Sequence, residues 1–238
     1  MPIALELAKR INALRYEDLP AEAVRWAKIG ILDTIGVTLA GSNDPCATIV
    51  AGVLSSGGSS LLLGTSKRTS PLDAALVNGT ASHALDFDDC SNTMGGHPSA
   101  PVLSALFALA DEIGASGRDF ITAYVGGFET ECKISLGVNL YQYTHGWHPT
   151  GTIGVFGAAA ACAKLLKLDD QRTAVALAIA ASLASGIKSN FGTYVKPLHV
   201  GQCARNGLFA ALIARDDYTA SPVAFEHKQG YFEVFNGA

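Results

Sequence analysis

The stretch Ala81-Ser-His-Ala-Leu-Asp-Phe-Asp-Asp-Cys-Ser-Asn-Thr-Met-Gly-Gly-His-Pro-Ser99 separates two apolar segments in a chain of 238 residues. Acid–base groups are denser here than anywhere else in the sequence, and the groups are Asp86, Asp88, Asp89, His83 and His97. A polar, glycine-bearing loop between two apolar helices suits a functional site better than a core. If the preceding helix continued through this stretch, side chains three or four positions apart would share one face.

The segments on both sides of this stretch are predicted helices. Ser70-Pro71-Leu72-Asp73 has a serine cap, a proline in the first turn and an acid three residues on, which indicates a helix from 71 to 85. Apolar residues recur at helical spacing over 101–113. Further helices are predicted at 3–14, 21–40, 45–54, 116–136, 155–166, 169–184 and 199–215. One short strand is predicted at 61–63, so the fold class is all-α, a bundle of about nine helices.

Composition narrows the function classes. Hydrophobic residues make up 49% of the chain and charged residues only 16%, so we expect a large apolar surface that a partner or another domain covers. The net charge of −4 gives no basic surface for nucleic acid. No apolar run is long enough to span a membrane, and the N-terminus has no signal-peptide order. Five scattered cysteines without a Cys-x-x-Cys pair indicate reduced thiols and a cytoplasmic location.

Three polar segments break the apolar pattern, at 86–97, 145–152 and 188–199. Each lies at a predicted helix boundary, where free backbone N–H groups can bind anions. Thr150 or Thr152 is expected to cap the helix that follows His148. The three segments together suggest an anionic ligand held by Lys196 and imidazoles, with Asp86 and one histidine as an acid–base pair. Cationic side chains can balance the negative charge of this ligand, so no metal and no cofactor is required.

Several motifs in this order resemble the MmgE/PrpD family, which includes 2-methylcitrate dehydratase, cis-aconitate decarboxylase and iminodisuccinate epimerase. The motifs are Leu32-Asp-Thr-Ile-Gly36 with Ala40-Gly41, Val77-Asn-Gly79, His83-Ala-Leu-Asp-Phe-Asp-Asp89, His97-Pro-Ser-Ala-Pro101, Gly146-Trp-His-Pro-Thr-Gly151, Lys196-Pro-Leu-His-Val-Gly201 and Ala204–Gly207. The resemblance implies one helical domain over 1–238 that forms a homodimer. It also implies an α+β lid domain, which we expect this chain to lack, so that the chain alone turns over little substrate.

The resemblance also implies roles for individual residues. Asp86, His97, His148 and Lys196 match catalytic positions of the family pocket. Cys90 stands where the family usually has threonine, and a thiol is a weaker hydrogen-bond donor. We assign three residues to substrate binding: Cys90, Thr150 and His199.

The shared chemistry implied by the resemblance is proton transfer at a carbon next to a carboxylate. Lys196 and His148 would stabilise the developing negative charge by gripping the carboxylate, and His97, alone or with Asp86, would move the proton. The expected enzyme is a lyase, a dehydratase or decarboxylase, for a small di- or tricarboxylate such as 2-methylcitrate or cis-aconitate. The alternatives are an epimerase of the same family and a non-catalytic helical dimerisation fragment of a longer enzyme.

Other interpretations apply to the remaining polar residues. Asp88 and Asp89 are interpreted as capping or solvated acids, and His83 as a hydrogen-bond partner that orients Asp86. His145 is expected to be exposed, and His199 can also cap the following helix. An isoprenoid-synthase-like enzyme that binds magnesium diphosphate would need a second acidic helix motif, which the sequence does not contain.

Overall fold

The computed structural model describes residues 1–55 and 57–236, and in these it is built from helices with one two-stranded sheet. The 3₁₀ helices are η1 (Tyr16–Asp18) and η2 (Lys188–Asn190), and the strands are β1 (Ser60–Leu61) and β2 (Arg68–Thr69). The α-helices are α1 (Ile3–Ala13), α2 (Ala21–Gly41), α3 (Pro45–Gly52), α4 (Pro71–Ser82), α5 (Ser99–Ile113), α6 (Gly117–Ser135), α7 (Tyr141–Thr144), α8 (Pro149–Leu165), α9 (Asp170–Leu183), α10 (Val195–Arg215) and α11 (Tyr231–Asn236). The predicted all-α class is confirmed.

Local sequence explains where several helices begin. The Ser70 hydroxyl accepts the N–H of Asp73 at the start of α4, and Ser116 does the same for Asp119 at the start of α6. These contacts satisfy backbone donors that have no partner inside the helix. Gly114 ends α5 in the left-handed conformation, with φ at +65°, as glycine commonly does after a helix.

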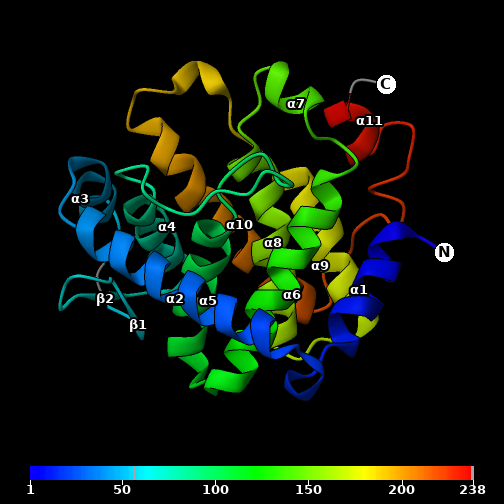
Figure 1. Cartoon of the computed structure of the whole chain (residues 1–238), viewed down its shortest axis with the longest axis horizontal. Helices are drawn as coiled ribbons and strands as arrows, with labels where there is room; N and C mark the ends of the chain where they lie inside the picture. The colour runs from blue at the N-terminus through cyan, green and yellow to red at the C-terminus, as the bar shows by residue number, and fades with distance from the viewer. Residues whose placement is uncertain (56, 237–238) are drawn as a thin grey trace.

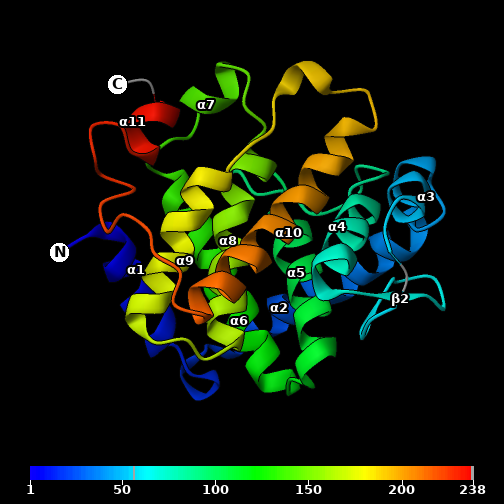
Figure 2. The same ribbon diagram turned by 180° about the vertical axis from the view of Figure 1, so that it is seen from behind.

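Helix α8 is the central element of the bundle. It packs against α5, α6, α9 and α10, and nearly all of its side chains are buried. Figure 1 shows α6 and α2 on the viewer's side of the bundle, and Figure 2 shows α10 crossing the back of α8 toward α4. Because α8 is surrounded by helices, it is rich in alanine and has no polar face.

Small residues allow the central helices to approach closely. A Cβ on Gly79 of α4 would lie 2.7 Å from the Cα of Gly201 in α10. A Cβ on Gly127 of α6 would lie 2.5 Å from the backbone oxygen of Gly157 in α8. Gly127 therefore lets α6 approach α8 closely.

The structure corrects several predicted boundaries. Helix α4 ends at Ser82 and not at 85, so Asp86 and Cys90 do not share a helix face. Helix α8 begins at Pro149 and α10 at Val195, each earlier than predicted. The described residues contain eleven α-helices instead of about nine, because α7 and α11 are too short to leave a periodic apolar pattern. The predicted strand at 61–63 is Ser60–Leu61, paired with Arg68–Thr69, which was missed.

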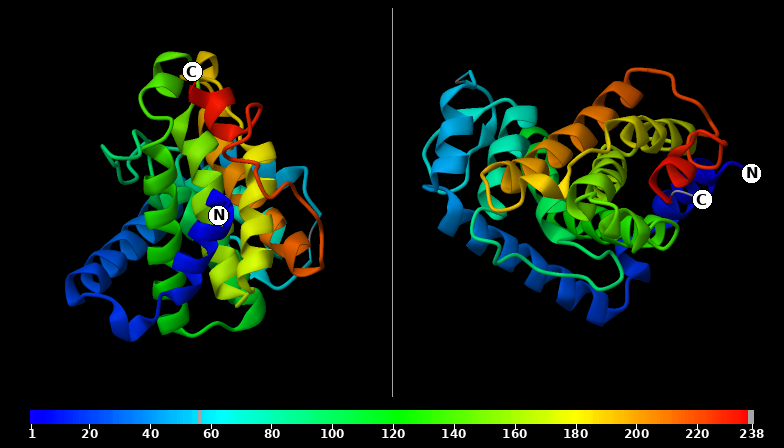
Figure 3. Two further views of the ribbon diagram at one scale, coloured as in Figure 1. Left: turned by 90° about the vertical axis from the view of Figure 1, so that its right-hand side faces the viewer. Right: turned by 90° about the horizontal axis from the view of Figure 1, so that it is seen from above.

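Helix α2 carries the apolar surface that the composition predicted. Trp26 is 56% exposed, Leu32 72% and Leu39 47%, and Phe87 from the segment after α4 is 73% exposed. Seen from above, that segment runs alongside α2 before the chain enters α5 (Figure 3). All five cysteines are free thiols. None of the helices in the described residues has the length and hydropathy that a membrane crossing requires.

Candidate active site

The segment between α4 and α5 is a tight loop fixed at both ends. It leaves α4 through a turn in which the Asp86 N–H donates to the His83 oxygen at 3.3 Å. Asp86 has a φ of +57°, a left-handed conformation that aspartate adopts more readily than most residues. At the other end Asp89 accepts the backbone N–H of Ser99 at 3.1 Å and so caps α5.

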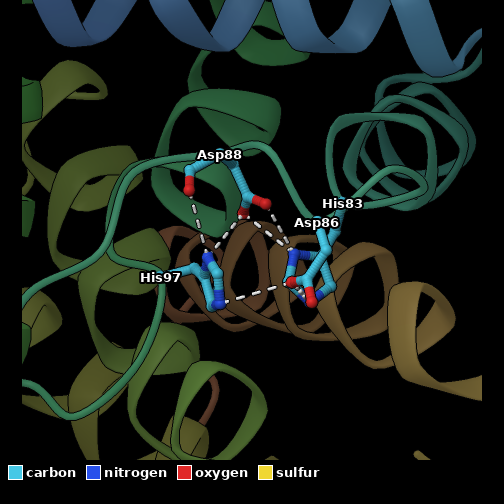
Figure 4. A group of neighbouring side chains, drawn as sticks. All are labelled: His83, Asp86, Asp88 and His97. Atoms are coloured by element: carbon cyan, nitrogen blue, oxygen red, sulfur yellow. Dashed lines mark hydrogen bonds and ion pairs between the residues drawn. The ribbon is translucent and has the colours of Figure 1, made fainter. Parts of the chain in front are cut away.

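A buried carboxylate organises the interior of this loop. The Asp88 side chain is fully buried, and its two oxygens accept the Nδ1–H of His83 at 2.8 and 2.9 Å. His97 Nδ1 lies 3.4 Å from the same carboxylate and 3.3 Å from the Asp88 backbone oxygen (Figure 4). A carboxylate and a carbonyl only accept hydrogen bonds, so Nδ1 of both rings carries the proton. The Nε2 atoms of both histidines are therefore left for chemistry.

Asp86 lies on the other side of the two rings. Its Oδ1 is 2.5 Å from Lys196 Nζ, 3.5 Å from His97 Nε2 and 3.7 Å from His83 Nε2. Burial raises the pKa of Asp86, but the Lys196 hydrogen bond and charge, with the two histidines, lower the pKa below its usual value. Asp86 is thus a carboxylate at neutral pH. Lys196 comes from the first turn of α10, so the close approach of α4 and α10 sets this pair.

The second and third polar segments meet through backbone pairing. Trp147 and Ile187 form an isolated antiparallel bridge, and the His148 N–H donates to the Gly186 oxygen at 3.0 Å. His148 Nδ1 then lies 3.1 Å from His199 Nδ1, so one of the two rings donates a proton to the other. His199 contacts His148 and does not cap the helix α10 in which it lies.

His148 is neutral in this environment. Burial, followed by the neighbouring His83, His199, Lys196 and His97, lowers the pKa of His148 to about 2. Burial and His83 also lower the pKa of His199. The expectation that His148 contributes positive charge is therefore wrong, because its site is buried and already contains a lysine. The neutral ring can still donate or accept a hydrogen bond.

A cavity of about 410 Å³ opens beside these groups. Five of the residues predicted for the site line it, namely Cys90, His97, His148, Thr150 and Lys196. Its volume falls within the range of small-molecule pockets. A larger cavity of about 910 Å³ lies elsewhere, near Lys164, and none of the predicted site residues lines it.

Two of the lining residues have contacts that qualify their predicted roles. The Thr150 hydroxyl accepts the backbone N–H of His97 at 3.1 Å, so Thr150 holds the His97 loop against α8. Neither Thr150 nor Thr152 caps α8, whose N-cap is His148 without a side-chain cap bond.

Burial and then the acids Asp88, Asp89 and Asp86 raise the pKa of the Cys90 thiol, which keeps it protonated. Substrate binding by Cys90, Thr150 and His199 stays a prediction.

The structure adds two residues that sequence reasoning undervalued. Asp88 is buried and holds two histidines, so its interpretation as a capping or solvated acid is wrong. His83 is bonded mainly to Asp88 and not to Asp86, and it is only 1% exposed. The sequence signal for Asp88 and His83 was the density of acids and histidines around them. Periodicity did not show which acid turns inward, because the loop after Ser82 has no repeating conformation.

Fold and site together define a helical domain in which three polar segments surround one acid–base cavity. The chain belongs to the MmgE/PrpD family, since the family model for the MmgE/PrpD N-terminal domain matches residues 5–238. The resemblance recognised in the sequence motifs is thereby confirmed, and the helical architecture agrees with it.

Related proteins carry names that refer to one reaction. The chain is 33% identical to the cis-aconitate decarboxylase-like protein oryM of Aspergillus oryzae, over 97% of this chain and 50% of that protein. It is 34% identical to human cis-aconitate decarboxylase over 89% of this chain and 46% of that protein. It is 29% identical to the Aspergillus terreus enzyme of the same name over 97% of this chain and 49% of that protein. The chain thus spans about half the length of these relatives.

Proposed function

We propose that this chain supplies the substrate-binding and proton-transfer residues of a lyase for a small di- or tricarboxylate. The observation that carries the proposal is the convergence of His97, His148 and Lys196 on one cavity, with Asp86 bonded to Lys196. The names of the relatives support cis-aconitate as the first substrate to test. The family resemblance of the sequence motifs supports 2-methylcitrate as the second.

Lys196 is proposed to bind a substrate carboxylate. Its ammonium group is held at 2.5 Å from Asp86 and lines the cavity, so it is charged and partly desolvated before substrate arrives. Neutral His148 is proposed to donate a hydrogen bond to the same substrate. Together these contacts stabilise negative charge as it develops on the carboxylate and the neighbouring carbon.

His97 is proposed to move the proton. Its Nδ1 is tied to Asp88, and its Nε2 faces the Asp86 carboxylate and can gain or lose a proton. In a decarboxylation the carbon–carbon bond breaks, CO₂ leaves, and the carbon that takes up the electron pair receives a proton from His97 Nε2, which first takes that proton from solvent. In a dehydration His97 Nε2 removes a proton from carbon, and the hydroxyl group on the next carbon leaves as water after taking that proton from His97. Epimerisation removes a proton and returns one to the opposite face.

One experiment tests the proposal and separates the three reactions. The purified chain is incubated with cis-aconitate, and separately with 2-methylcitrate, in D₂O and followed by NMR. Loss of CO₂ identifies decarboxylation, loss of water identifies dehydration, and deuterium exchange without net loss identifies the proton transfer of an epimerase. His97→Gln is expected to reduce the rate by about 10²–10⁴-fold, while exposed His145→Gln leaves it unchanged. Absence of both binding and conversion, or full activity in His97→Gln, contradicts the proposal.

We further propose that a second copy covers the apolar face of α2. Trp26, Leu32 and Phe87 are exposed there, and a cavity of about 580 Å³ lies between α2, Phe87 and Phe128. A homodimer would remove this apolar area from water. Leu32→Glu is expected to yield monomers in sedimentation experiments if the wild-type chain is dimeric, and a wild-type monomer at high concentration would contradict the proposal.

A further inference from the structure

His83 presents a buried nitrogen that has no hydrogen-bond partner in the described part of the chain. The residue is 1% exposed, and its Nε2 is without a partner while Nδ1 is bonded to Asp88. The nearest acid oxygen, Asp86 Oδ1, is 3.7 Å from Nε2, too long for a hydrogen bond. Buried polar atoms are rarely left unsatisfied, and those that are often indicate a ligand.

The surroundings of this nitrogen have the geometry of a metal site. His83, Asp86, Asp88 and His97 each offer a ligand atom, and these atoms lie within 4.8 Å of one another. Metal–ligand bonds of 2.0–2.1 Å place the corners of a tetrahedron about 3.3–3.4 Å apart. The distances from Asp86 Oδ1 to the Nε2 atoms of His97 and His83, 3.5 and 3.7 Å, are close to that spacing.

The outer contacts also match those of metal sites. Ligating histidines usually donate their other ring N–H to a carboxylate, which fixes the tautomer and the ring orientation. The Asp88 carboxylate does this for His83, and the Asp88 backbone oxygen does it for His97 at 3.3 Å, which leaves both Nε2 lone pairs directed at Asp86 (Figure 4). Two imidazoles and one carboxylate suit Zn²⁺ and similar transition-metal ions better than Mg²⁺ or Ca²⁺, which prefer oxygen ligands.

We propose that His83, His97 and Asp86 bind a divalent transition-metal ion in exchange for the Lys196 ammonium group. In the structure Lys196 Nζ lies 2.5 Å from Asp86 Oδ1. Lys196 also lines the cavity, which gives its side chain room to turn away from Asp86. A bound metal ion would occupy the Asp86 carboxylate and His97 Nε2, the two groups that the proposed proton transfer requires. The metal-bound form is therefore inhibited, and this consequence rests on the proposed function, whereas metal binding itself does not.

Zn²⁺ titration of the purified chain by isothermal calorimetry, without substrate, tests the site. One Zn²⁺ per chain is expected, and His83→Gln weakens binding at least tenfold. Lys196→Met tightens binding, because it removes the competing cation; a purely structural role for His83 would not produce this increase. Exposed His145→Gln and Cys90→Ser are expected to bind Zn²⁺ as the wild type does.

Several outcomes would overturn the site. These are no binding by the wild type, equal binding by His83→Gln, weaker binding by Lys196→Met, or loss of binding in Cys90→Ser. If His83→Gln does not fold, as circular dichroism would show, Asp86→Asn on the more exposed ligand replaces it, with the same tenfold loss expected. Zn²⁺ binding by a chain that neither binds nor converts cis-aconitate would refute the proposed function and leave the metal site intact.

Discussion

Replacing Asp88 by asparagine tests the central claim about the site, that the buried residue Asp88 sets the tautomers of two histidines, His83 through its carboxylate and His97 through its backbone oxygen and the nearby carboxylate. The carboxylate accepts the His83 Nδ1–H at 2.8 and 2.9 Å and lies 3.4 Å from His97 Nδ1. Asparagine keeps one acceptor oxygen and places an NH₂ group where the second oxygen was. Retaining the His83 bond turns the NH₂ group toward His97 and favours movement of the His97 proton from Nδ1 to Nε2, against the bond that Nδ1 donates to the backbone oxygen of residue 88 at 3.3 Å.

The magnitude follows from these contacts. Hydrogen bonds to charged groups contribute about 1.5–3 kcal/mol and neutral ones about 0.5–1.5 kcal/mol. Loss of the charge at the His83 bond and rearrangement at His97 should together lower the free energy of unfolding by about 1–3 kcal/mol. His97 Nε2 would then carry a proton directed at Asp86, 3.5 Å away, and could no longer accept one from substrate.

Urea unfolding measures the loss of stability, and ¹⁵N NMR of the imidazole nitrogens reports the tautomers. Asp216→Asn is the matched control, since Asp216 is exposed and pairs only with its neighbour Arg215. It is expected to change the free energy of unfolding by less than about 1 kcal/mol. Unchanged ring signals in Asp88→Asn, with stability equal to that of the control, would refute the reasoning.

Three further predictions concern packing and pH. Gly79→Ala should lower the free energy of unfolding by about 1–3 kcal/mol, since the added Cβ would lie 2.7 Å from the Cα of Gly201. Thermal unfolding measures this loss. Gly36→Ala is the control and is expected to be no less stable than the wild type, because a Cβ there meets nothing within 4 Å. Burial and Asp89 raise the pKa of Glu131 well above 4.5, so the folded state holds a proton that the unfolded state releases. The contribution of Glu131 to wild-type stability therefore falls as pH rises above about 4.5, and urea unfolding of Glu131→Gln, compared with the wild type at each pH, should show this contribution removed. His148 has the opposite sign, because its imidazole in the unfolded chain gains a proton below the usual histidine pKa of 6.5, while burial keeps the folded one neutral down to about 2. The His148 contribution to stability should fall by about 1.4 kcal/mol per pH unit below 6.5, and it opposes the Glu131 contribution between pH 4.5 and 6.5. His148→Gln should remove the His148 contribution in the same measurement.

Part of the fold could be predicted because its signals are local. Ser70 and Ser116 cap the helices that their neighbours predict, since a capping contact joins residues three positions apart. The beginning of α8 was placed too late, because Gly151 and Gly154 in its first turns lower helix propensity. Burial among surrounding helices overrides that propensity, and only the packed structure contains this information.

The candidate site divides in the same way. Motifs that belong to the family identified Asp86, His97, His148 and Lys196, and the structure brings these four residues to one region. The roles of Asp88 and His83 required coordinates, because an isolated loop does not reveal which of three neighbouring acids turns inward. The neutral state of His148 also depends on burial, which no motif reports.

The sequence by itself determined the helical class, the helix caps, the family and the residue types available for acid–base chemistry. These depend on contacts between near neighbours or on motifs read directly from the chain. Tertiary structure alone decided that Lys196 in α10 meets Asp86 after α4, and that Asp88 lies buried between two imidazoles. The first contact joins residues far apart in the sequence, and it exists because Gly79 and Gly201 let the two helices touch. The second exists because a buried carboxylate is stable only where donors such as the two histidines surround it.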